Sequence, residues 1–407
     1  MTRPAPWIDA AAAAARLGVS RATLYAYVSR GLIRSQLLPG SSRAHGYARE
    51  DVERLRQRTA ARRDPALAAA HALEWGVPVL ESAITFIDGR ALYYRGHDVV
   101  TLARERSLEE VAALIWTGGF NAVFPPALPA TIAAAAPERH APFVLRAQTR
   151  LAAAAADDPG AGDLRPASVA AAGWRMLHLL ADAAAGVRGT RRRRVETMDQ
   201  QLARAWKTGP HGAEILRATL ILCADHELNV SSFTARCVAS AGSTPYAVVI
   251  AGLAALEGFR HGGSGVRVDA MIGGLRAEVS ARSARDRQRA LERAIGARMR
   301  AGDVVGGFGH QLYPAGDPRA KALLDLLERR AAGSAELAYL RAFQRAAAAI
   351  VREEPNLDFA LAGVARVLRL PAGAPLMLFA IGRTIGWIGQ AIEQYATGQL
   401  IRPRARY

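Results

Sequence analysis

Seven side chains in the second half of the sequence are the ones best suited to carry out chemistry. They are His226, His261, His310, Arg319, Asp358, Arg383 and Arg402. Histidine and aspartate transfer protons near neutral pH, and guanidinium groups bind carboxylates through paired hydrogen bonds. The set would suit acid–base chemistry on a substrate that carries carboxylates. Each member alone has a commoner structural role, so the surrounding sequence decides the interpretation.

Two of the histidines lie in different local contexts. Residues 224–236 predict a helix, and His226 and Asn229, three residues apart, would share one face of it. A histidine on a mostly apolar helix is usually a hydrogen-bonded core residue. His261 is followed by Gly262 and Gly263, which let backbone and ligand approach each other closely. A simple loop between two helices would have the same sequence features.

A glycine-rich loop precedes the third histidine. Gly306, Gly307, Phe308 and Gly309 lead to His310, and the free N–H groups of such a loop could line a cofactor pocket. The loop lacks the Gly-Lys-Ser/Thr ending of a phosphate loop, and no strand precedes it as a dinucleotide fingerprint requires. It therefore indicates neither of these two nucleotide sites.

Two charged residues of the set lie where helices are expected to begin. Asp317 and a following proline open a helix that has Arg319 in its first turn. Asn356 precedes Asp358 at the next helix start, where the helix macrodipole would keep the carboxylate ionised, as a general base needs. An ordinary N-cap is the alternative role for this aspartate.

The last two arginines differ in their surroundings. Arg383 lies between Gly382 and Gly386, whose spacing of four permits close helix packing. An arginine at such a position suggests contact with a buried anion. Arg402 lies in a basic C-terminal segment, for which a solvated tail is the simpler explanation.

The N-terminal 63 residues predict a separate small unit. Asp9 can cap an alanine-rich helix that ends before Gly18, and Ser20 can cap a second helix over residues 21–29. A charged helix is expected over residues 50–63. This stretch holds 12 arginines against four acidic residues, and the whole chain carries a net charge of +17 with only two lysines. The concentration of positive charge at this end favours an anionic partner.

The rest of the chain predicts a hairpin followed by helices. Residues 77–87 alternate β-branched and polar side chains, and Asp88-Gly89 is a turn signal. A helical pattern is expected from Leu102 almost to the end. Cys223 and Cys237 are expected on one helix, about 21 Å apart, which excludes a disulfide. No apolar run is long enough for a membrane span, and a cytoplasmic location is expected.

In their order and local sequences, the seven residues resemble the citrate synthase family over residues 73–407, and residues 87–99 resemble its N-terminal hairpin. The resemblance implies a mainly α, two-domain fold, with a large domain over 73–266 and 362–407 and a small domain over 267–361. It also implies a homodimer in which Arg402 acts across the interface. No metal and no tightly bound cofactor are implied, and acetyl-CoA is a co-substrate.

The resemblance implies a role for each matched residue in condensing acetyl-CoA with oxaloacetate to citrate. The base is Asp358, the enolate is stabilised by a neutral His261, and the keto carbonyl is polarised by His310. Oxaloacetate is held by the matched residues His226, Asn229, Arg319, Arg383 and Arg402. Coenzyme A is held by Gly306, Gly307, Phe308, Gly309 and Asn356. A 2-methylcitrate synthase that uses propionyl-CoA stays open, because one methylene is worth only about 1–3 kcal/mol.

Three departures from the family pattern lie around two of the histidines. Phe259-Arg260 replaces a usual Pro-Leu before His261, Ser264-Gly265 follows the glycines, and Gln311 replaces a common arginine after His310. The positive charge of Arg260 would disfavour protonation of His261. These changes bear on rate and substrate preference more than on fold.

Residues 17–35 resemble the winged helix-turn-helix of the MerR type, and the combined arrangement resembles a bacterial subgroup of citrate synthase-like proteins. The resemblance implies a domain over 1–63 in which Arg21, Thr23 and Tyr27 face a DNA groove and Arg43 lies in the wing. A docking module without DNA binding is the alternative. The chain could therefore also be a DNA-binding regulator whose synthase domain senses a metabolite.

Overall fold

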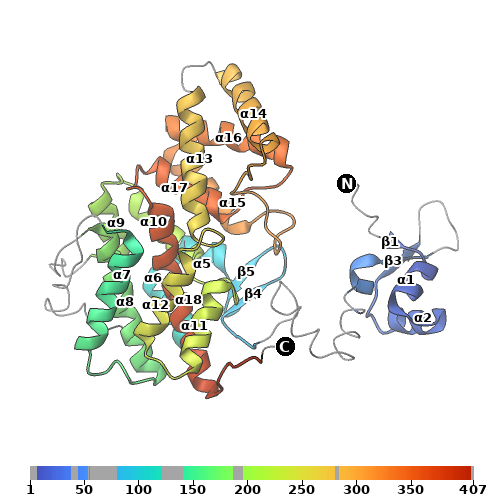
Figure 1. Ribbon diagram of the computed structural model, residues 1–407, viewed down its shortest axis with the longest axis horizontal. Coiled ribbons are helices and arrows are strands. Elements are labelled where there is room, and N and C mark those ends of the chain that lie inside the picture. Colours follow the sequence, from blue (N-terminus) through green and yellow to red (C-terminus); the bar gives the residue numbers. More distant parts are fainter. Residues whose placement is uncertain are drawn as a thin grey trace. The chain divides into compact units, whose positions relative to one another are not determined.

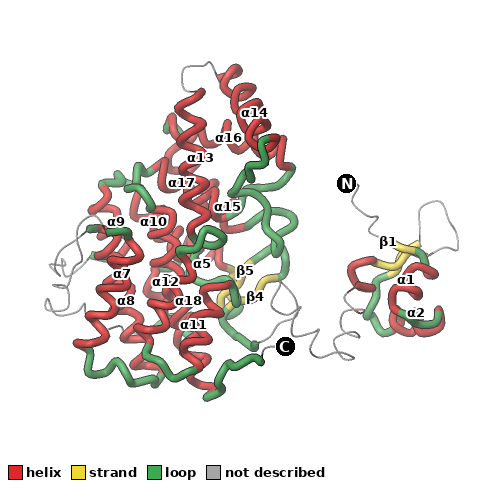
Figure 2. Tube along the Cα trace, in the orientation of Figure 1, coloured by secondary structure: helices red, strands yellow, loops and turns green. Residues whose placement is uncertain are grey.

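The computed structural model describes residues 7–37, 45–53, 55, 80–121, 124, 141–186, 196–279 and 284–404. The chain divides into two compact units, Met1–Glu81 and Ser82–Tyr407. Helices make up most of both units, and strands are few and short (Figures 1 and 2). The expectation of a mainly α protein is therefore confirmed.

Two capped helices and a small antiparallel sheet form the first unit. Its elements are β1 (Trp7–Ile8), α1 (Ala10–Leu17), α2 (Arg21–Ser29), β2 (Ser35–Leu37) and β3 (His45–Ala48), with strand order β1-β3-β2. The Asp9 carboxylate accepts a hydrogen bond from Ala12 N, and Ser20 Oγ accepts one from Thr23 N. Gly18 ends α1 at φ 65°, in the left-handed region. These local predictions are confirmed, because caps depend on neighbouring residues alone.

The face that α2 turns outward differs from the predicted one. Tyr27 packs against the small hydrophobic core of this unit, together with Leu24 of the same helix. Thr23 Oγ1 lies 2.9 Å from Ser20 Oγ and takes part in the cap. Arg21 and Tyr25 are exposed instead. Thr23 and Tyr27 are half-buried, because the helix is rotated to bury Leu24, and their contact with a DNA groove stays a prediction. Arg43 lies outside the described residues.

The second unit begins with a three-stranded antiparallel sheet. Its strands are β4 (Thr85–Ile87), β5 (Leu92–Tyr94) and β6 (His97–Asp98), in the order β4-β5-β6. The expected turn is present, and Asp88 Oδ1 accepts hydrogen bonds from the backbone of Arg90 at 2.8 Å and Ala91 at 2.7 Å. A longer strand was predicted over residues 77–87. In its described part, only residues 85–87 form a strand, which pairs with β5.

Helices make up most of the other described residues of this unit, and Figure 1 shows α14 and α16 together at one end of it. Their bounds are α5 (Val99–Glu105), α6 (Leu108–Thr117), α7 (Phe143–Asp157), α8 (Pro166–Ala185), α9 (Met198–Trp206), α10 (Gly212–Leu222), α11 (Val230–Ser240), α12 (Pro245–Leu256), α13 (Gly263–Val279), α14 (Ala284–Arg300), α15 (Pro318–Ala331), α16 (Ala335–Val351), α17 (Leu357–Val367) and α18 (Ala374–Thr397). None of the helices in these described ranges is both long enough and apolar enough to cross a membrane.

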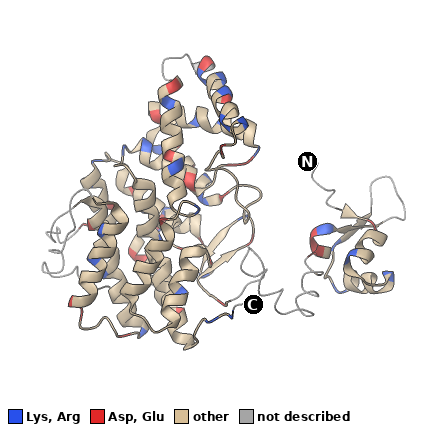
Figure 3. Cartoon of the chain, viewed as in Figure 1, with Lys and Arg blue, Asp and Glu red and all other residues tan. Residues whose placement is uncertain are grey.

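Helix α18 is the central element of the large core. It packs against α6, α8, α10, α11, α12, α13 and α17, and its residues are buried along most of its length. Charged side chains gather instead on α14 (Figure 3). Gly382 and Gly386 permit the close packing that their spacing predicts, since a Cβ on Gly386 would lie 2.3 Å from the carbonyl oxygen of Ala224.

The chain between α10 and α11 departs from the predicted single helix. Helix α10 ends at Leu222, and α11 begins at Val230 with Asn229 as its N-cap. His226 therefore lies in a loop, and Cys223 and Cys237 lie on either side of it as free thiols. The break places His226 in the loop between α10 and α11 rather than on the side of a continuous helix.

Candidate active site

Most of the predicted site residues lie at helix ends and in the loops between helices, and Arg383 lies in the middle of α18. The rings of His226 and His310, which are 84 positions apart in the sequence, have centroids 5.2 Å apart. Both histidines also contact the ring of Tyr313, with centroids at 5.6 and 4.9 Å. The fold thus brings two separate histidine segments together around one buried tyrosine.

His226 is buried and neutral. Its Nε2 lies 3.0 Å from the Tyr313 hydroxyl. Burial, together with the positive charges of Arg319 and Arg383, lowers the pKa of His226 well below its usual value. A neutral imidazole can donate one hydrogen bond to a polar ligand or accept one from it, and it adds no charge to the site.

His261 is positioned through the first turn of α11. Its Nε2 lies 2.8 Å from Ser231 Oγ, which also receives a hydrogen bond from Trp387 Nε1 at 3.2 Å. The serine has one proton, which it can give either to His261 or to Asn229 Oδ1 at 2.9 Å. When the proton goes to His261 Nε2, the histidine carries its own proton on Nδ1.

Burial is the main reason why His261 is uncharged. Burial and the positive charge of Arg383 lower the pKa of His261 to about 4. The sequence had suggested Arg260 as the source of this effect, and that suggestion is wrong. The guanidinium of Arg260 lies 5.5 Å from the ring of Phe259, which is 62% exposed, and α13 contributes Arg267 at 5.9 Å from the same ring.

The two glycines after His261 are required by packing. A Cβ on Gly262 would lie 2.8 Å from the carbonyl oxygen of Leu256, and one on Gly263 would lie 2.6 Å from that of Glu257. Any larger residue would have to displace the backbone. The turn can therefore pass closely behind the histidine, as the sequence predicts.

The side chain of Asn229 belongs to the helix cap. Its Oδ1 accepts hydrogen bonds from the backbone N–H groups of Ser231 and Ser232, both at 3.2 Å. Its Nδ2 donates to the carbonyl oxygen of His226 at 3.3 Å. Asn229 thereby holds the loop of His226 against the start of α11.

His310 has a defined tautomer. The backbone N–H of Leu312 donates to His310 Nδ1 at 3.1 Å, so the ring proton is on Nε2. Burial and Arg319 lower the pKa of His310 to about 4, although Asp317 opposes the change. Near neutral pH this group is a neutral hydrogen-bond donor through Nε2.

Asp358 is a half-buried carboxyl group in the first turn of α17. Burial raises its pKa to about 6, while a hydrogen bond from Ser264 and the charge of Arg319 oppose the rise. A Cβ on Gly265 would lie 3.5 Å from Asp358 Oδ1, which places the carboxylate beside the turn of His261. The sequence predicted an ionised group held by the helix macrodipole, but burial has the larger effect. The group is still mostly ionised at pH 7 and is a stronger base for being buried.

Asn356 connects the glycine-rich loop to α17. Its Oδ1 accepts from Asp358 N at 3.1 Å, and its Nδ2 donates to the carbonyl oxygen of Gly309 at 2.9 Å. Its own backbone N–H donates to the carbonyl oxygen of Gly307 at 2.9 Å. Gly307 and Gly309 have φ values of 88° and 74°, which side chains disfavour. The loop conformation and the position of Asp358 therefore depend on one asparagine.

Arg319 and Asp317 form a buried bidentate ion pair. Arg319 Nε donates to Asp317 Oδ1 at 3.0 Å and a terminal nitrogen donates to Oδ2 at 2.8 Å. Burial alone would lower the pKa of Arg319, but Asp317 outweighs it and the pKa is raised. Asp317 Oδ2 also accepts from the backbone N–H of Leu357 at 3.2 Å. The pair thus joins the starts of α15 and α17, next to Asp358.

Arg383 is buried in the middle of α18. Its Nε donates to the carbonyl oxygen of Cys223 at 2.8 Å, and its guanidinium lies 4.8 Å from the ring of Phe379. The same ring lies 5.7 Å from that of His261. Burial lowers the pKa of Arg383, and the carboxylate of Asp225 opposes this. The arginine remains a cation beside the histidine loop, as its unusual sequence position suggested.

Arg402 is the one member of the set of seven that the chain does not bring to the cluster. It is exposed, and the preceding Ile401 N donates to Ser240 Oγ at 3.0 Å, at the C-terminal end of α11. The cluster lies at the opposite end, near Asn229, and 11 helical residues span about 16 Å.

Three residues in the cluster were missed by the sequence analysis. Tyr313, Ser231 and Phe379 contact the histidines, and all lie close in sequence to residues that were identified. A tyrosine or phenylalanine in an apolar context predicts core packing, and a serine after an asparagine predicts a cap. No signal in one sequence separates these roles. Among the residues that the structure describes, no group of three or more His, Cys, Asp or Glu could hold a metal ion.

Comparisons with known proteins agree with this arrangement. The family model described as "Citrate synthase, C-terminal domain" matches residues 72–404. A "Citrate synthase" of Haloferax volcanii is 30% identical over 364 residues, covering 82% of this chain and 94% of that protein. A "2-methylcitrate synthase 2" of Corynebacterium glutamicum is 32% identical over 203 residues, about half of each chain.

A solved structure shares the fold. It is a citrate synthase from Thermoplasma acidophilum in a ternary complex with carboxymethyl coenzyme A and oxaloacetate, and it matches with a TM-score of 0.67 at 22% identity. The match covers 81% of this chain and 94% of that one. With the family model, the Haloferax relative and the fold in agreement, this chain belongs to the citrate synthase family.

Proposed function

We propose that this protein condenses acetyl-CoA with oxaloacetate and hydrolyses the product to citrate and coenzyme A. One observation carries the proposal. A carboxylate with a raised pKa, Asp358, lies in a half-buried cluster with two neutral histidines, His261 and His310, and the two buried arginines Arg319 and Arg383. A carbon acid needs a base of this kind, and the resulting oxyanion needs neutral hydrogen-bond donors in a water-poor site.

The first step is enolisation of the thioester. Asp358 takes a proton from the acyl methyl group, and the pair of electrons left behind forms the enolate. The Nδ1–H of His261 donates to the enolate oxygen, since Ser231 can supply a proton to Nε2. The low pKa of His261 keeps this group a neutral donor rather than an acid that would protonate the enolate.

Carbon–carbon bond formation follows at the keto acid. The Nε2–H of His310 donates to the keto oxygen, and the enolate carbon attacks the carbonyl carbon. The new alkoxide takes the Nε2 proton of His310. Water then cleaves the thioester: its hydroxide bonds to the acyl carbon, its other proton restores the His310 ring, and the departing thiolate of coenzyme A takes the proton held by Asp358.

Oxaloacetate is held by His226, Arg319 and Arg383 in this proposal, with Asn229 keeping the loop of His226 in place. Arg402 completes the site from the partner subunit of a homodimer, because within its own chain it follows a contact at the far end of α11, a helix about 16 Å long. Two or more guanidinium groups are needed to match the two carboxylates.

Thiol release is the direct test of the proposed reaction. Acetyl-CoA and oxaloacetate together should give a free thiol that a disulfide reagent detects, and either substrate alone should not. Acetyl-CoA and propionyl-CoA should be compared in the same assay, because the alternative is 2-methylcitrate synthesis. Absence of thiol release with both esters would refute the proposal.

The hydrogen bond between Ser231 and His261 leads to a prediction on rate. Replacing Ser231 with alanine removes the donor to Nε2, so the imidazole can move its proton away from Nδ1. We expect kcat to fall about 2- to 13-fold, the value of one hydrogen bond, with the KM for oxaloacetate unchanged. Ser232→Ala is the control, because that hydroxyl contacts the Asn229 amide instead. Equal kcat values for the two variants would contradict the assignment.

The glycine-rich loop and Asn356 form the proposed coenzyme A site, with Gly306, Gly307, Phe308 and Gly309 contacting the thioester arm. Val268 of α13 packs against this loop, within 3.2 Å of a Cβ on Gly306. The adjoining exposed surface carries the cations of Arg260 and Arg267, and neither arginine forms an ion pair with another residue that the structure describes. A phosphate-bearing substrate would be attracted to such a surface.

This surface leads to a prediction on salt dependence. The double variant Arg260→Ala/Arg267→Ala should raise the KM for acetyl-CoA and make it less sensitive to salt, with kcat unchanged, because exposed charges are screened by ions. Steady-state assays from 20 to 300 mM salt measure this. Arg329→Ala/Arg330→Ala on α15 is a control of equal charge. The same salt slope in both variants would contradict a local effect.

The proposal includes the division into a large and a small domain, with the two domain boundaries moved. The expected boundaries at 266/267 and 361/362 fall inside the continuous helices α13 and α17. A continuous helix is a poor hinge, so we propose that closure pivots at the helix starts, near Gly262-Gly263 and Pro355-Asn356.

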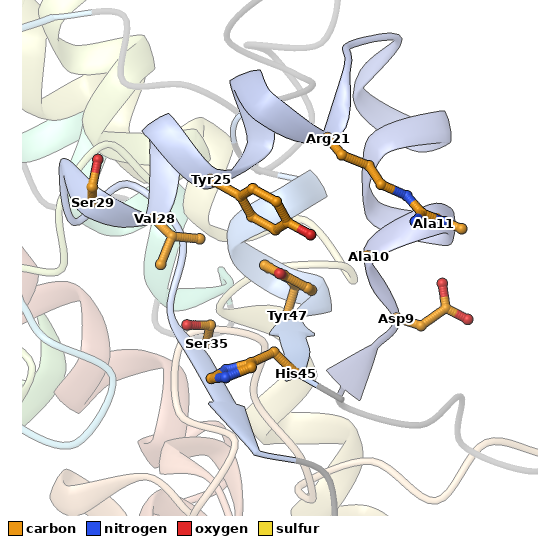
Figure 4. Close-up of a pocket in the computed structure, with 10 residues that line it drawn as sticks. All are labelled: Asp9, Ala10, Ala11, Arg21, Tyr25, Val28, Ser29, Ser35, His45 and Tyr47. Atoms are coloured by element: carbon orange, nitrogen blue, oxygen red, sulfur yellow. The ribbon is translucent and has the colours of Figure 1, made fainter. Parts of the chain in front are cut away.

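A second candidate function, DNA binding by the first unit, is favoured by its geometry. Helices α1 and α2, joined by three residues and followed by the β2–β3 pair, have the order of a MerR-type winged helix-turn-helix. A pocket of about 670 Å³ lies between α2 and the sheet, lined among others by Arg21, Tyr25 and His45 (Figure 4). These groups, rather than Thr23 and Tyr27, are the proposed contacts.

Salt dependence tests DNA binding as well. Affinity for genomic DNA fragments should fall steeply with salt, and Arg21→Ala should reduce the slope by about one phosphate contact. Weak binding with no salt dependence would dismiss this candidate and leave the unit as a docking module.

A further inference from the structure

The β4–β5 hairpin contacts the loop of His226 through a buried phenol. Tyr94 is fully buried, and its hydroxyl receives a hydrogen bond from the backbone N–H of Asp225 at 3.0 Å. The same hydroxyl shares its proton between the carbonyl oxygens of Ile221 at 3.2 Å and Asp225 at 3.1 Å. Both backbone groups of the residue before His226 therefore depend on one side chain from a distant part of the sequence.

A second contact from the hairpin reaches the carboxylate of the same residue. Thr85 Oγ1 donates to Asp225 Oδ2 at 2.6 Å. The other oxygen, Oδ1, faces α18 so closely that a Cβ on Gly386 would lie 2.4 Å from it. Gly386 is one turn beyond Arg383, and the carboxylate of Asp225 is the leading opposite charge that acts on that arginine. Asp225 thus lies between the hairpin and the buried cation.

The hairpin turn also lies near the loop of the second histidine. A Cβ on Gly89 would be 3.8 Å from the carbonyl oxygen of Leu312, the residue whose N–H fixes the tautomer of His310. One hairpin therefore contacts the loop of His226 and lies near the loop of His310. Its backbone is anchored to α18, because Ala83 N donates to Glu393 Oε1 at 3.0 Å.

We infer that Tyr94 and Thr85 are positioning residues of the condensation site, which act through Asp225 to set the places of His226 and Arg383. The inference rests on the proposed function for the roles of these two groups in holding the keto acid. The reason is geometric: each of the three hydrogen-bonding groups of Asp225 in this network, its N–H, its C=O and its carboxylate, has a partner in the hairpin. A shift of this residue moves His226, the next residue in the chain.

The strand offers a matched control. Tyr93 is adjacent to Tyr94 on the opposite face of β5, where it stacks on Phe86 with ring centroids 5.9 Å apart. Its hydroxyl approaches Asp88 at 3.4 Å in the exposed turn. Tyr93→Phe removes the same atom from the same strand and leaves Asp225 untouched.

Steady-state kinetics and calorimetry on the full chain test the inference. Tyr94→Phe should raise both the KM and the Kd for oxaloacetate about 2- to 13-fold, because the displacement of His226 should weaken binding by about as much as one lost hydrogen bond, with the KM for acetyl-CoA unchanged. Tyr93→Phe should leave all three constants unchanged. A purely structural role for the phenol would lower the melting temperature without separating the two substrates.

A second pair of variants tests the inference independently, in case Tyr94→Phe does not fold. Thr85→Val should weaken oxaloacetate binding in the same direction, and Thr85→Ser, which restores the hydroxyl, should recover it. Equal oxaloacetate constants for Tyr94→Phe and Tyr93→Phe, or for Thr85→Val and Thr85→Ser, would overturn the inference. If the wild-type protein binds oxaloacetate but releases no thiol, the proposed reaction is refuted. The oxaloacetate Kd values of the variants would then still decide the inference. A wild-type protein that does not bind oxaloacetate would overturn both.

Discussion

Replacing Asp358 with asparagine should lower kcat by about 10²- to 10⁴-fold, the usual contribution of a general base. Asparagine has almost the same shape and can keep the contacts at the start of α17, but it cannot accept a proton from carbon. The KM for oxaloacetate should change little, because the keto acid contacts other residues in the proposed site. Thiol release under saturating substrates measures the loss.

The same variant should be at least as stable as the wild type at pH 7. The pKa of Asp358 is raised from 3.8 to about 6 on folding, because burial disfavours the charged form. As pH rises from 3.8 to 6, the unfolded chain loses this proton first, so the folded state loses stability, and the full penalty is present above pH 6. Asparagine avoids the penalty. The melting temperature of the variant should therefore exceed that of the wild type at pH 7 and approach it below pH 4.

The pH profile of the wild-type enzyme should reflect the ionisation of Asp358. We expect kcat/KM to rise with pH to a plateau above an apparent pKa near 6, as Asp358 becomes ionised. His261 and His310 have pKa values of about 4 and stay neutral throughout this range. An intact rate in Asp358→Asn, or a profile that is flat between pH 5 and 7, would contradict the assignment of Asp358 as the base.

Replacing Arg319 with methionine should cost about 3–5 kcal/mol of unfolding free energy and should also abolish measurable oxaloacetate binding. The stability loss arises because Asp317, which is 2% exposed, would remain as a buried charge without its partner. The binding loss arises because the guanidinium is one of the proposed contacts for a substrate carboxylate. Urea unfolding and calorimetry measure the two effects separately.

A double variant separates stability from binding. Asp317→Asn combined with Arg319→Met replaces the ion pair by neutral groups, and the asparagine oxygen can still accept from the backbone N–H of Arg319 at the helix cap. We expect most of the unfolding free energy to return while oxaloacetate binding stays lost. Binding that returns with stability would show that Arg319 supports the fold alone, and that another group holds the substrate.

The sequence by itself determined the features that depend on near neighbours. The cap at Asp9, the left-handed Gly18 and the turn at Asp88 were predicted correctly, because their hydrogen bonds join residues within three or four positions. The helical class and the family followed from residue order and local context. The close approach at Gly386 also followed, since a spacing of four places two glycines on one helix face.

Tertiary structure alone decided how these residues are oriented and charged. The rotation of α2 that buries Leu24 was set by a core whose members are spread over the N-terminal unit. The neutrality of His261 comes from burial and from Arg383, which is 122 positions away, rather than from its neighbour Arg260. Asp225 and Tyr94 carried no signal at all, because their contacts join segments more than 100 residues apart. Burial and long-range charge set the pKa values of this site, and neither can be read from local sequence.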